Sequence, residues 1–480
     1  MTGRVNGGLI NGGLIAAELT LIRRDRAFLL ACVFMLFLGA YATFSGLHWQ
    51  SAREASHRQS VETSLAAVDR ELAQLLALEI GELPLEASPS TGLPHVARTE
   101  FYLPPTPISG LAIGDSELRP SYAAISATVR AHELFRFQEV DNPIVLGLGR
   151  FDFAFVVIYL LPLLILGFGC MTLSADRENR SLQMVLSHPV TIARIAALRI
   201  ALRTGLAVLS VIGGLALGLL WAGENGGEAL PALTGYVLTL MAYAVFWMSI
   251  ALWIVALNRN SETNAVLMVT SWLLWVLVVP ALATFAAKEI HPVPSRLEYI
   301  VAARDSENAA NTRSRGLLQR YLLDHPELEA TQNNAVAPFI KTFYLVQREV
   351  EQSLSPIVQS FATAEAAQQD LRLSLRWLSP RDVAAESLLL SSGNDTPRFT
   401  EFEHQARQLR EEWLSAVETA VISGRRLSAT EFADLPRSRF NETPASKTVT
   451  RQAVSVLALL ALSGLITLAA LRRLRHYSPV

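Results

Sequence analysis

The sequence predicts an all-α membrane protein with six transmembrane helices and a mostly helical extracytoplasmic domain. The first observation behind this prediction is composition: of 480 residues, 51% are hydrophobic and only 18% are charged, whereas soluble domains carry about 25% charged residues. The second is clustering, because the apolar residues form runs of about 20, the length with which a helix crosses the hydrocarbon core of a bilayer. A mean hydropathy of +0.31 agrees with both.

Six apolar runs are long enough to cross a bilayer. The predicted spans are residues 27–47, 153–173, 205–222, 233–257, 264–287 and 453–471. The third run is the shortest, and Arg199 and Arg203 before it can extend toward lipid headgroups. Any one run could instead be a buried helix of a soluble core, but six together favour a membrane.

The first run has an alternative interpretation as a cleaved secretory signal. It follows several arginines and contains Ala40-Tyr41-Ala42 before a polar stretch. Its apolar part exceeds the roughly 7–15 residues typical of a signal peptide. We therefore expect a retained membrane anchor.

Arginines near the spans predict the orientation. They gather in the N-terminal segment 1–26, in the loop 174–204 and in the C-terminal tail 472–480. Because basic loops remain in the cytoplasm, both termini are predicted to be cytoplasmic in a multi-pass protein of the bacterial inner (plasma) membrane. Residues 48–152 and 288–452 are then extracytoplasmic.

The first external segment is predicted to be helical without strands. From Ser51 to Ile80 the apolar residues recur at three- and four-residue spacing, as on one face of a helix. The proline-rich stretch from Pro84 to Pro107 predicts a surface loop. Residues 122–137 are predicted to form a second helix that leads back to the membrane.

The second external segment is longer and also predicted to be helical. The candidate helices are residues 296–324, 337–376, 384–391 and 398–422, separated by breaks at Pro326, Pro356, Pro380 and Ser392–Asn394. With 105 and 165 residues, both external segments are large enough to hold a core. The pattern allows one joint domain or two.

No catalytic, metal or nucleotide site is predicted within this chain. The nine histidines are scattered, and both cysteines lie in apolar runs. A P-loop needs a lysine between glycine and Ser or Thr, and Lys288, Lys341 and Lys447 all lack that context. We therefore expect no enzyme activity and no cofactor here. The net charge of −2 argues against a strongly basic nucleic-acid-binding protein, and the scarcity of acids in the spans argues against an ion-coupled carrier.

The loop after the second span is the most informative cytoplasmic stretch. A charged cluster leaves the membrane, an apolar edge follows, and a proline then breaks the helix. The candidate docking residues are Asp176, Arg177, Glu178, Ser181, Leu182, Val185, Leu186, His188, Pro189 and Arg194. Such an edge fits the groove of a partner protein, although an ordinary interhelical loop is an equal alternative on this evidence.

A second candidate region precedes the first span. There apolar and charged residues alternate at helical spacing, as in an amphipathic helix that lies along the membrane surface. The residues concerned are Glu18, Leu19, Ile22, Arg23 and Arg26.

These blocks resemble those of the ABC-2 type permeases, the membrane subunits of a class of ATP-binding-cassette transporters. The resemblance rests on Phe151–Phe155, on the cluster Asp176–Glu178 and on Leu186-Ser187-His188-Pro189. The usual glycine after the acidic residue is replaced by Asn179 or Arg180. Closer likeness is to a subgroup with two large external insertions, related to permeases associated with multicopper-enzyme maturation. It is carried by Glu18-Leu19, Asn142-Pro143, Leu378-Ser379-Pro380 and Phe402-Glu403-His404.

The resemblance implies a half-transporter that pairs with a second copy or a sibling permease in the lipid bilayer. Two copies of a separate ABC ATPase subunit would supply ATP and Mg and drive export of a substrate. Residues 174–204 would hold the gate and coupling helices, and residues 1–26 the elbow helix. One alternative is mechanotransmission, in which the external segments act on periplasmic partners without transport. Another is a non-ABC receptor or scaffold. The substrate, the direction of transport and the homodimer-or-heterodimer question stay open.

Overall fold

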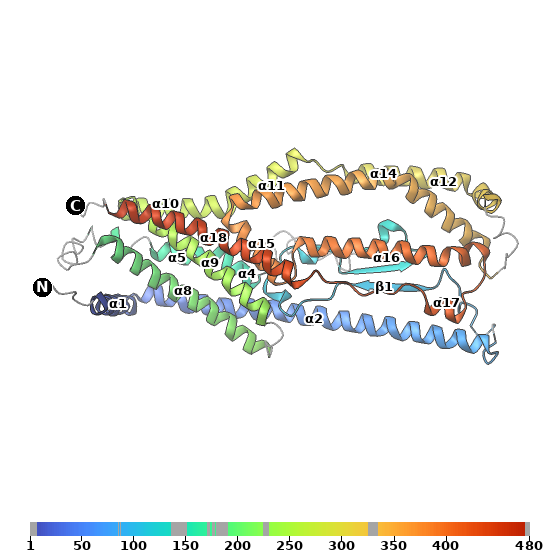
Figure 1. Cartoon of the computed structure of the whole chain (residues 1–480), viewed down its shortest axis with the longest axis horizontal. Helices are drawn as coiled ribbons and strands as arrows, with labels where there is room; N and C mark the ends of the chain where they lie inside the picture. The colour runs from blue at the N-terminus through green and yellow to red at the C-terminus, as the bar shows by residue number, and fades with distance from the viewer. Residues whose placement is uncertain are drawn as a thin grey trace.

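The computed structural model describes residues 7–84, 86, 88–135, 151–169, 173–174, 178, 191–223, 230–324 and 335–475. These residues are almost entirely helical and form an elongated molecule (Figure 1). We call the left half of Figure 1 the apolar region. It contains α1 (Gly7–Arg24), the first half of α2 (Arg26–Glu79), α4 (Phe153–Phe155), η5 (Val156–Leu160), α5 (Leu161–Gly169), α8 (Ile192–Ala222), α9 (Leu230–Ala256), α10 (Ser261–Leu273), η6 (Leu274–Val278), α11 (Val279–Ile290) and α18 (Ala445–Leu474).

The other half is the distal region. It contains the second half of α2, β1 (Arg98–Tyr102), η2 (Ser109–Leu111), η3 (Ser116–Leu118), β2 (Tyr122–Ser126), η4 (Ala131–Glu133), α12 (Arg296–Asp324), α14 (Pro338–Leu375), η7 (Arg376–Leu378), α16 (Thr396–Ser423) and α17 (Ala429–Ala433). Helix α15 (Pro380–Ser391) lies at the junction, where it packs against α9 and α18.

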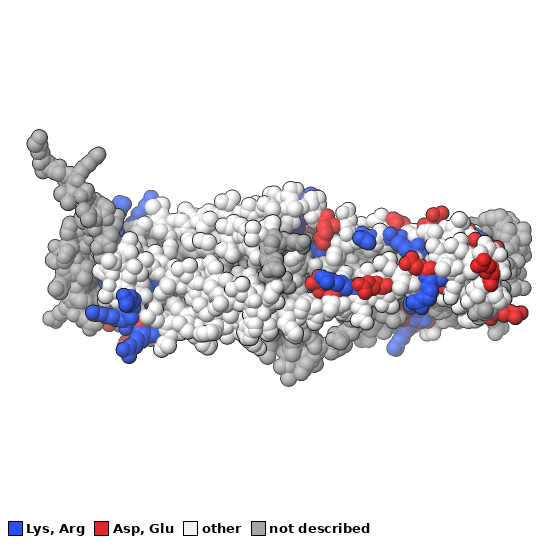
Figure 2. Space-filling view, turned by 90° about the horizontal axis from the view of Figure 1, so that it is seen from below, with Lys and Arg blue, Asp and Glu red and all other residues white. Residues whose placement is uncertain are grey.

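Five helical stretches are long and apolar enough to cross a membrane. They are Arg26–Glu79, Ile192–Ala222, Leu230–Ala256, Ser261–Ile290 and Ala445–Leu474. Four of them contain a predicted span, and Leu230–Ala256 covers all but the last residue of the predicted 233–257. The remaining prediction, 153–173, overlaps the shorter apolar helix Phe153–Gly169, which is too short to count among the five. Figure 2 shows the result on one face of the molecule: a broad uncharged band separates basic residues at one end from mixed charges in the distal region. The fold is that of a helical, multi-pass membrane protein.

Small residues allow α2 and α8 to pack closely in the apolar region. A Cβ added at Gly214 would lie 2.5 Å from the Leu36 carbonyl oxygen, and one at Gly218 would lie 2.4 Å from Thr43 Cβ. Such contacts between backbones are a common basis of helix association in bilayers, where the hydrophobic effect contributes little. Helix α9 lies at the centre, is the most buried candidate span, and packs against α18.

Helix α2 is continuous from the apolar region to the far end of the distal region (Figure 1). The carboxylate of Asp25 caps its first turn by accepting a hydrogen bond from the Phe28 amide at 3.1 Å. The predicted membrane span 27–47 and the predicted external helix that begins at Ser51 are therefore parts of one 54-residue helix.

The distal region has a core of its own, and its aromatic rings come from distant segments. Phe101 on β1 stacks on Phe402 of α16 with ring centroids 5.3 Å apart, and Trp413 of the same helix is fully buried. The expectation of an external segment without strands is wrong here. Tyr122–Ser126, predicted to be helical, forms an antiparallel pair with Arg98–Tyr102. The strand forms because this distant segment provides its hydrogen-bonding partner, which the local sequence pattern does not show.

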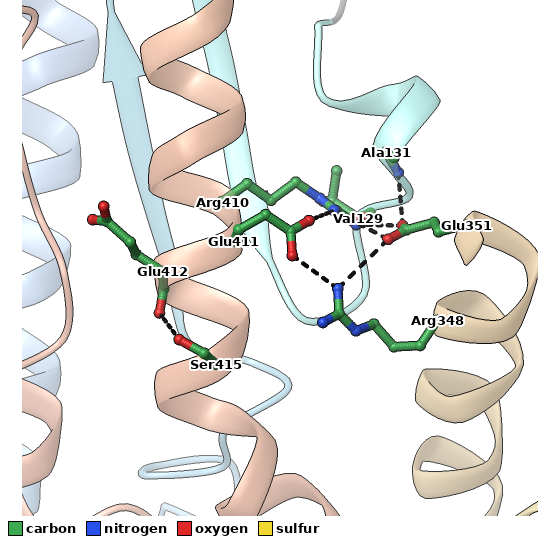
Figure 3. Close-up of polar contacts among 8 residues, drawn as sticks. All are labelled: Val129, Ala131, Arg348, Glu351, Arg410, Glu411, Glu412 and Ser415. Atoms are coloured by element: carbon green, nitrogen blue, oxygen red, sulfur yellow. Dashed lines mark hydrogen bonds and ion pairs between the residues drawn. The ribbon is translucent and has the colours of Figure 1, made fainter. Parts of the chain in front are cut away.

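A network of ion pairs connects α14, α16 and the loop after β2 (Figure 3). Arg410 on α16 donates to Glu351 on α14, with Nη1 and Oε2 3.2 Å apart, and to the Val129 carbonyl at 3.4 Å. Arg348 on α14 forms an ion pair with Glu411 on α16, with Nη1 and Oε2 3.1 Å apart. The side chain of Arg410 is only 5% exposed. This buried network therefore holds α14 and α16 in position against the loop after β2.

Candidate functional site

The predicted docking residues are only partly within the described chain. Those that lie outside it are Asp176, Arg177, Ser181, Leu182, Val185, Leu186, His188 and Pro189. Glu178 is described, and its carboxylate accepts a hydrogen bond from the Ser261 amide at 2.8 Å, in the first turn of α10. Arg194 is exposed in the first turn of α8. The loop after the second apolar run therefore contacts the start of α10.

The structure places the predicted elbow residues Glu18, Leu19, Ile22 and Arg23 on α1, at the same end of the molecule as the end of α18 (Figure 1), and Arg26 at the start of α2. Ile22 is buried, whereas Leu19 is 46% exposed. Arg23 and Arg26 are exposed. Exposed leucine beside arginine suits a helix at a membrane surface, where the apolar side chain enters the lipid and the guanidinium stays in water.

Glu18 makes the contact that fixes α1. Its carboxylate accepts a hydrogen bond from Nε of Arg199 on α8 at 2.6 Å. Both residues are buried, with 7% and 8% of their surfaces exposed. Charges removed from water in this way are held together strongly, and removing one partner of a buried pair typically costs about 3–5 kcal/mol. α1 and the first turns of α8 thus form one unit.

Arg203, one turn further along α8, makes a second connection. Its Nη1 lies 3.2 Å from Oδ2 of Asp25, the residue between α1 and α2, and donates to the Phe168 carbonyl at 3.2 Å. Its guanidinium also lies 5.6 Å above the ring of Phe28. The first part of α8, which lies within the predicted coupling segment 174–204, is therefore connected to the Asp25 junction, to α2 and to the end of α5.

A second candidate site is a cavity of about 450 Å³ at the junction of the apolar and distal regions. Such a volume is typical of small-molecule sites. One wall is apolar and comes from α4, η5 and α11, and the other is charged and comes from α14, η7 and α15. The lining residues are Gly114, Asp115, Asp152, Ala154, Phe155, Ile158, Tyr159, Pro280, Ala283, Thr284, Arg372, Leu373, Arg376, Arg381, Asp382, Ala385, Glu386 and Leu389.

Irregular helix turns shape the apolar wall. Segment η5 is π-helical, and its freed carbonyls find partners on neighbouring helices: Tyr243 Oη donates to the Ile158 carbonyl at 3.1 Å, and Trp272 Nε1 to the Tyr159 carbonyl at 3.2 Å. Single π-helical turns within α-helices occur frequently at functional sites. Segment η6 is a second such turn, immediately before α11.

The charged wall contains one satisfied ion pair. Arg381 donates from Nη1 to Asp382 at 2.7 Å and from Nη2 to the Tyr159 hydroxyl at 2.6 Å. Asp152 is also satisfied, because its carboxylate accepts from the amides of Phe155 at 2.7 Å and Ile113 at 2.8 Å. These bonds join the second apolar helix to α15 and to the loop after η2.

Three other charged residues of this wall are not ion-paired within the part of the chain that the structure describes: Arg372, which is exposed to solvent, and Arg376 and Glu386, which are partly buried. Among the same described residues, Nε of Arg376 is buried without a partner. Burial raises the pKa of Glu386 above its usual value. Sequence reasoning missed this cavity, since its residues come from segments far apart in the chain. The only local signal was arginines at helical spacing just before Ser379-Pro380.

The comparisons with known proteins match only the distal part of the chain. The sequence profile of a domain of unknown function, DUF3526, matches residues 296–441. This range runs from α12 to the segment after α17 and contributes the charged wall of the cavity. No curated protein matches the chain, and no solved structure matches it.

Proposed function

We propose that this chain is the membrane-spanning permease subunit of an ABC transporter of the ABC-2 type, energised by a separate ATPase subunit. In this proposal two copies, or one copy and a sibling permease, cross the inner membrane with six helices each and cytoplasmic termini. Two ATPase subunits dock on residues 174–204 and hydrolyse ATP with Mg, and a substrate is exported. The observation that carries the proposal is the buried Glu18–Arg199 ion pair.

This pair supports the proposal because of its position in the chain. Arg199 lies at the end of the predicted coupling segment and Glu18 lies on the predicted elbow helix. A partner that displaces the coupling segment would move α8. Because the buried pair connects the two helices, α1 would move together with α8.

The test is ATPase stimulation in a reconstituted complex. The chain is co-expressed with a candidate ABC ATPase from a neighbouring reading frame, and ATP hydrolysis is measured in liposomes for the wild type and for Leu182→Glu and Leu186→Glu. We expect both variants to insert normally and to lose the stimulation. Leu323→Glu is the matched control, because Leu323 is 73% exposed on α12 in the distal region. Normal stimulation in both docking variants, or absence of any co-purifying ATPase, would reject the proposal.

The continuous helix α2 favours a second candidate function, mechanotransmission. A helix of 54 residues is about 80 Å long, and it has no break between the apolar and distal regions. A hinge made by inserting Gly-Gly-Ser after Arg58 separates the two functions. Under mechanotransmission the insertion abolishes ATP-dependent movement of spin labels in the distal region and leaves ATP hydrolysis intact. Retention of both that movement and all activity would exclude it.

A further inference from the structure

The junction cavity is amphipathic, and part of its apolar wall belongs to a helix that also exposes large apolar side chains. Pro280 and Ala283 of α11 line the cavity. On the same helix, Leu282 is 60% exposed and Phe285 is 62% exposed. Because this helix belongs to a candidate membrane span, its exposed apolar side chains lie where lipid acyl chains can contact them. A molecule in the cavity can therefore keep an apolar part in the bilayer.

The charges left over in the cavity define the polar part of such a molecule. Arg381 is paired with Asp382, and Asp115 is paired with Arg119 at 2.9 Å. Two guanidinium groups and one carboxylate remain, those of Arg372, Arg376 and Glu386. Arg376 and Glu386 are partly buried, and unpaired charges away from bulk water are costly. Arg372 is exposed to solvent beside them. A ligand that brings one anionic and one cationic group would pair with all three.

The position of Arg376 agrees with an interfacial headgroup. Its guanidinium lies 4.7 Å from the ring centroid of Trp377, and Trp377 is 44% exposed. Tryptophan side chains prefer the level of the headgroups, where one edge of the ring is apolar and the other polar. Arginine binds phosphate with several parallel N–H groups, and cationic pockets between membrane helices bind lipid headgroups.

We propose that this cavity binds the headgroup of a zwitterionic phospholipid with a primary ammonium, of the phosphatidylethanolamine class. The phosphate lies against Arg372 and Arg376, the ammonium lies against Glu386, and the acyl chains lie along α11. This assignment depends on the membrane fold but not on the proposed ATPase. The lipid site and the permease function can therefore be tested, and rejected, independently. Since the charged wall belongs to residues 296–441, the lipid would connect the distal region to the bilayer.

The experiment is lipid titration of the full chain in detergent, with bound lipid counted by native mass spectrometry. Phosphatidylethanolamine, phosphatidylglycerol and the tail-free glycerophosphoethanolamine are the three probes. We expect one saturable site with tighter binding of phosphatidylethanolamine than of phosphatidylglycerol. The double variant Arg372→Gln/Arg376→Gln should weaken both lipids by about tenfold or more, since hydrogen bonds to charged groups are the strong ones.

Glu386→Gln gives the decisive second readout. It should remove the preference for phosphatidylethanolamine and leave binding of phosphatidylglycerol unchanged, a result that a misfolded variant cannot produce. Arg313→Gln, at an exposed arginine of α12, is the control and should bind both lipids like the wild type. Wild-type lipid binding by the double arginine variant would overturn the proposal, as would equal losses of both lipids in Glu386→Gln. Binding of the tail-free headgroup as tight as that of the lipid would show a site for a soluble ligand instead.

Discussion

The guanidinium of Arg199 lies 2.6 Å from the carboxylate of Glu18, and together they fasten α1 to α8. Because both groups are buried, Glu18→Gln removes a buried carboxylate that neutralises the arginine and should lower the free energy of unfolding by about 3 kcal/mol. Thermal unfolding in detergent measures the loss. Asp25→Asn is the matched control: its pair with Arg203 spans 3.2 Å and is partly exposed, so about 1 kcal/mol is expected. Equal effects would contradict the assignment.

The ion pair between Arg410 and Glu351 should matter more than the surface pairs of the same helix. Arg410 is 5% exposed and joins α16 to α14, so Arg410→Ala should destabilise the distal region by about 3 kcal/mol. Arg407→Ala removes an exposed pair with Glu403 and should cost less than about 1 kcal/mol. Protease resistance of the distal region distinguishes them. A resistant Arg410→Ala variant would show that the network is dispensable.

Asp395 should make the stability of the junction depend on pH. Burial, followed by the nearby charge of Glu386, raises the pKa of Asp395 from 3.8 to about 6. An acid with a raised pKa favours the folded state below its ordinary pKa, and that advantage is lost as pH rises through about 6. Asp395→Asn should therefore stabilise the protein at pH 7.5, by about 3 kcal/mol, by about half of that at pH 5, and change little at about pH 3.5, below the ordinary pKa of 3.8. Melting temperatures across this range test it, and a variant less stable at pH 7.5 contradicts it.

Gly46 of α2 and Gly110 of η2 form a backbone contact that excludes any side chain. A Cβ at Gly46 would lie 1.9 Å from the Gly110 carbonyl oxygen. Gly46→Ala should therefore separate the two segments and lower the free energy of unfolding by more than about 2 kcal/mol. Gly205→Ala, in a helix with open space around it, should be neutral or stabilising. Thermal unfolding of the two variants decides, and a tolerated alanine at residue 46 would refute the contact.

Much of the helical fold follows from local pattern. The predicted helix 296–324 coincides with α12, and the predicted 337–376 nearly coincides with α14. The predicted break at Pro356 is wrong, because α14 continues through it. A proline inside a helix costs about 3 kcal/mol, and the packing of α14 against α11, α12 and α16 offsets that cost.

What local pattern missed depends on contacts between distant segments. The strand at Tyr122–Ser126 exists because Arg98–Tyr102 pairs with it. The junction cavity likewise needs Tyr159 from one apolar helix, Ala283 from another, and Arg376 and Glu386 from the matched domain. No window of the sequence contains such a set. A helix before the first span was predictable, but its buried partner Arg199 was expected to reach toward lipid headgroups.

Because α2 is a single unbroken helix, a small tilt at one end produces a large displacement at the other. The helix starts beside α1 and α8 and ends beyond the sheet, about 80 Å away by its 54 residues. A stiff rod of that length acts as a lever arm: tilting it by about 5° at its base displaces its tip by about 7 Å. Motions too small to open a path between helices at the base would still rearrange the far surface of the molecule.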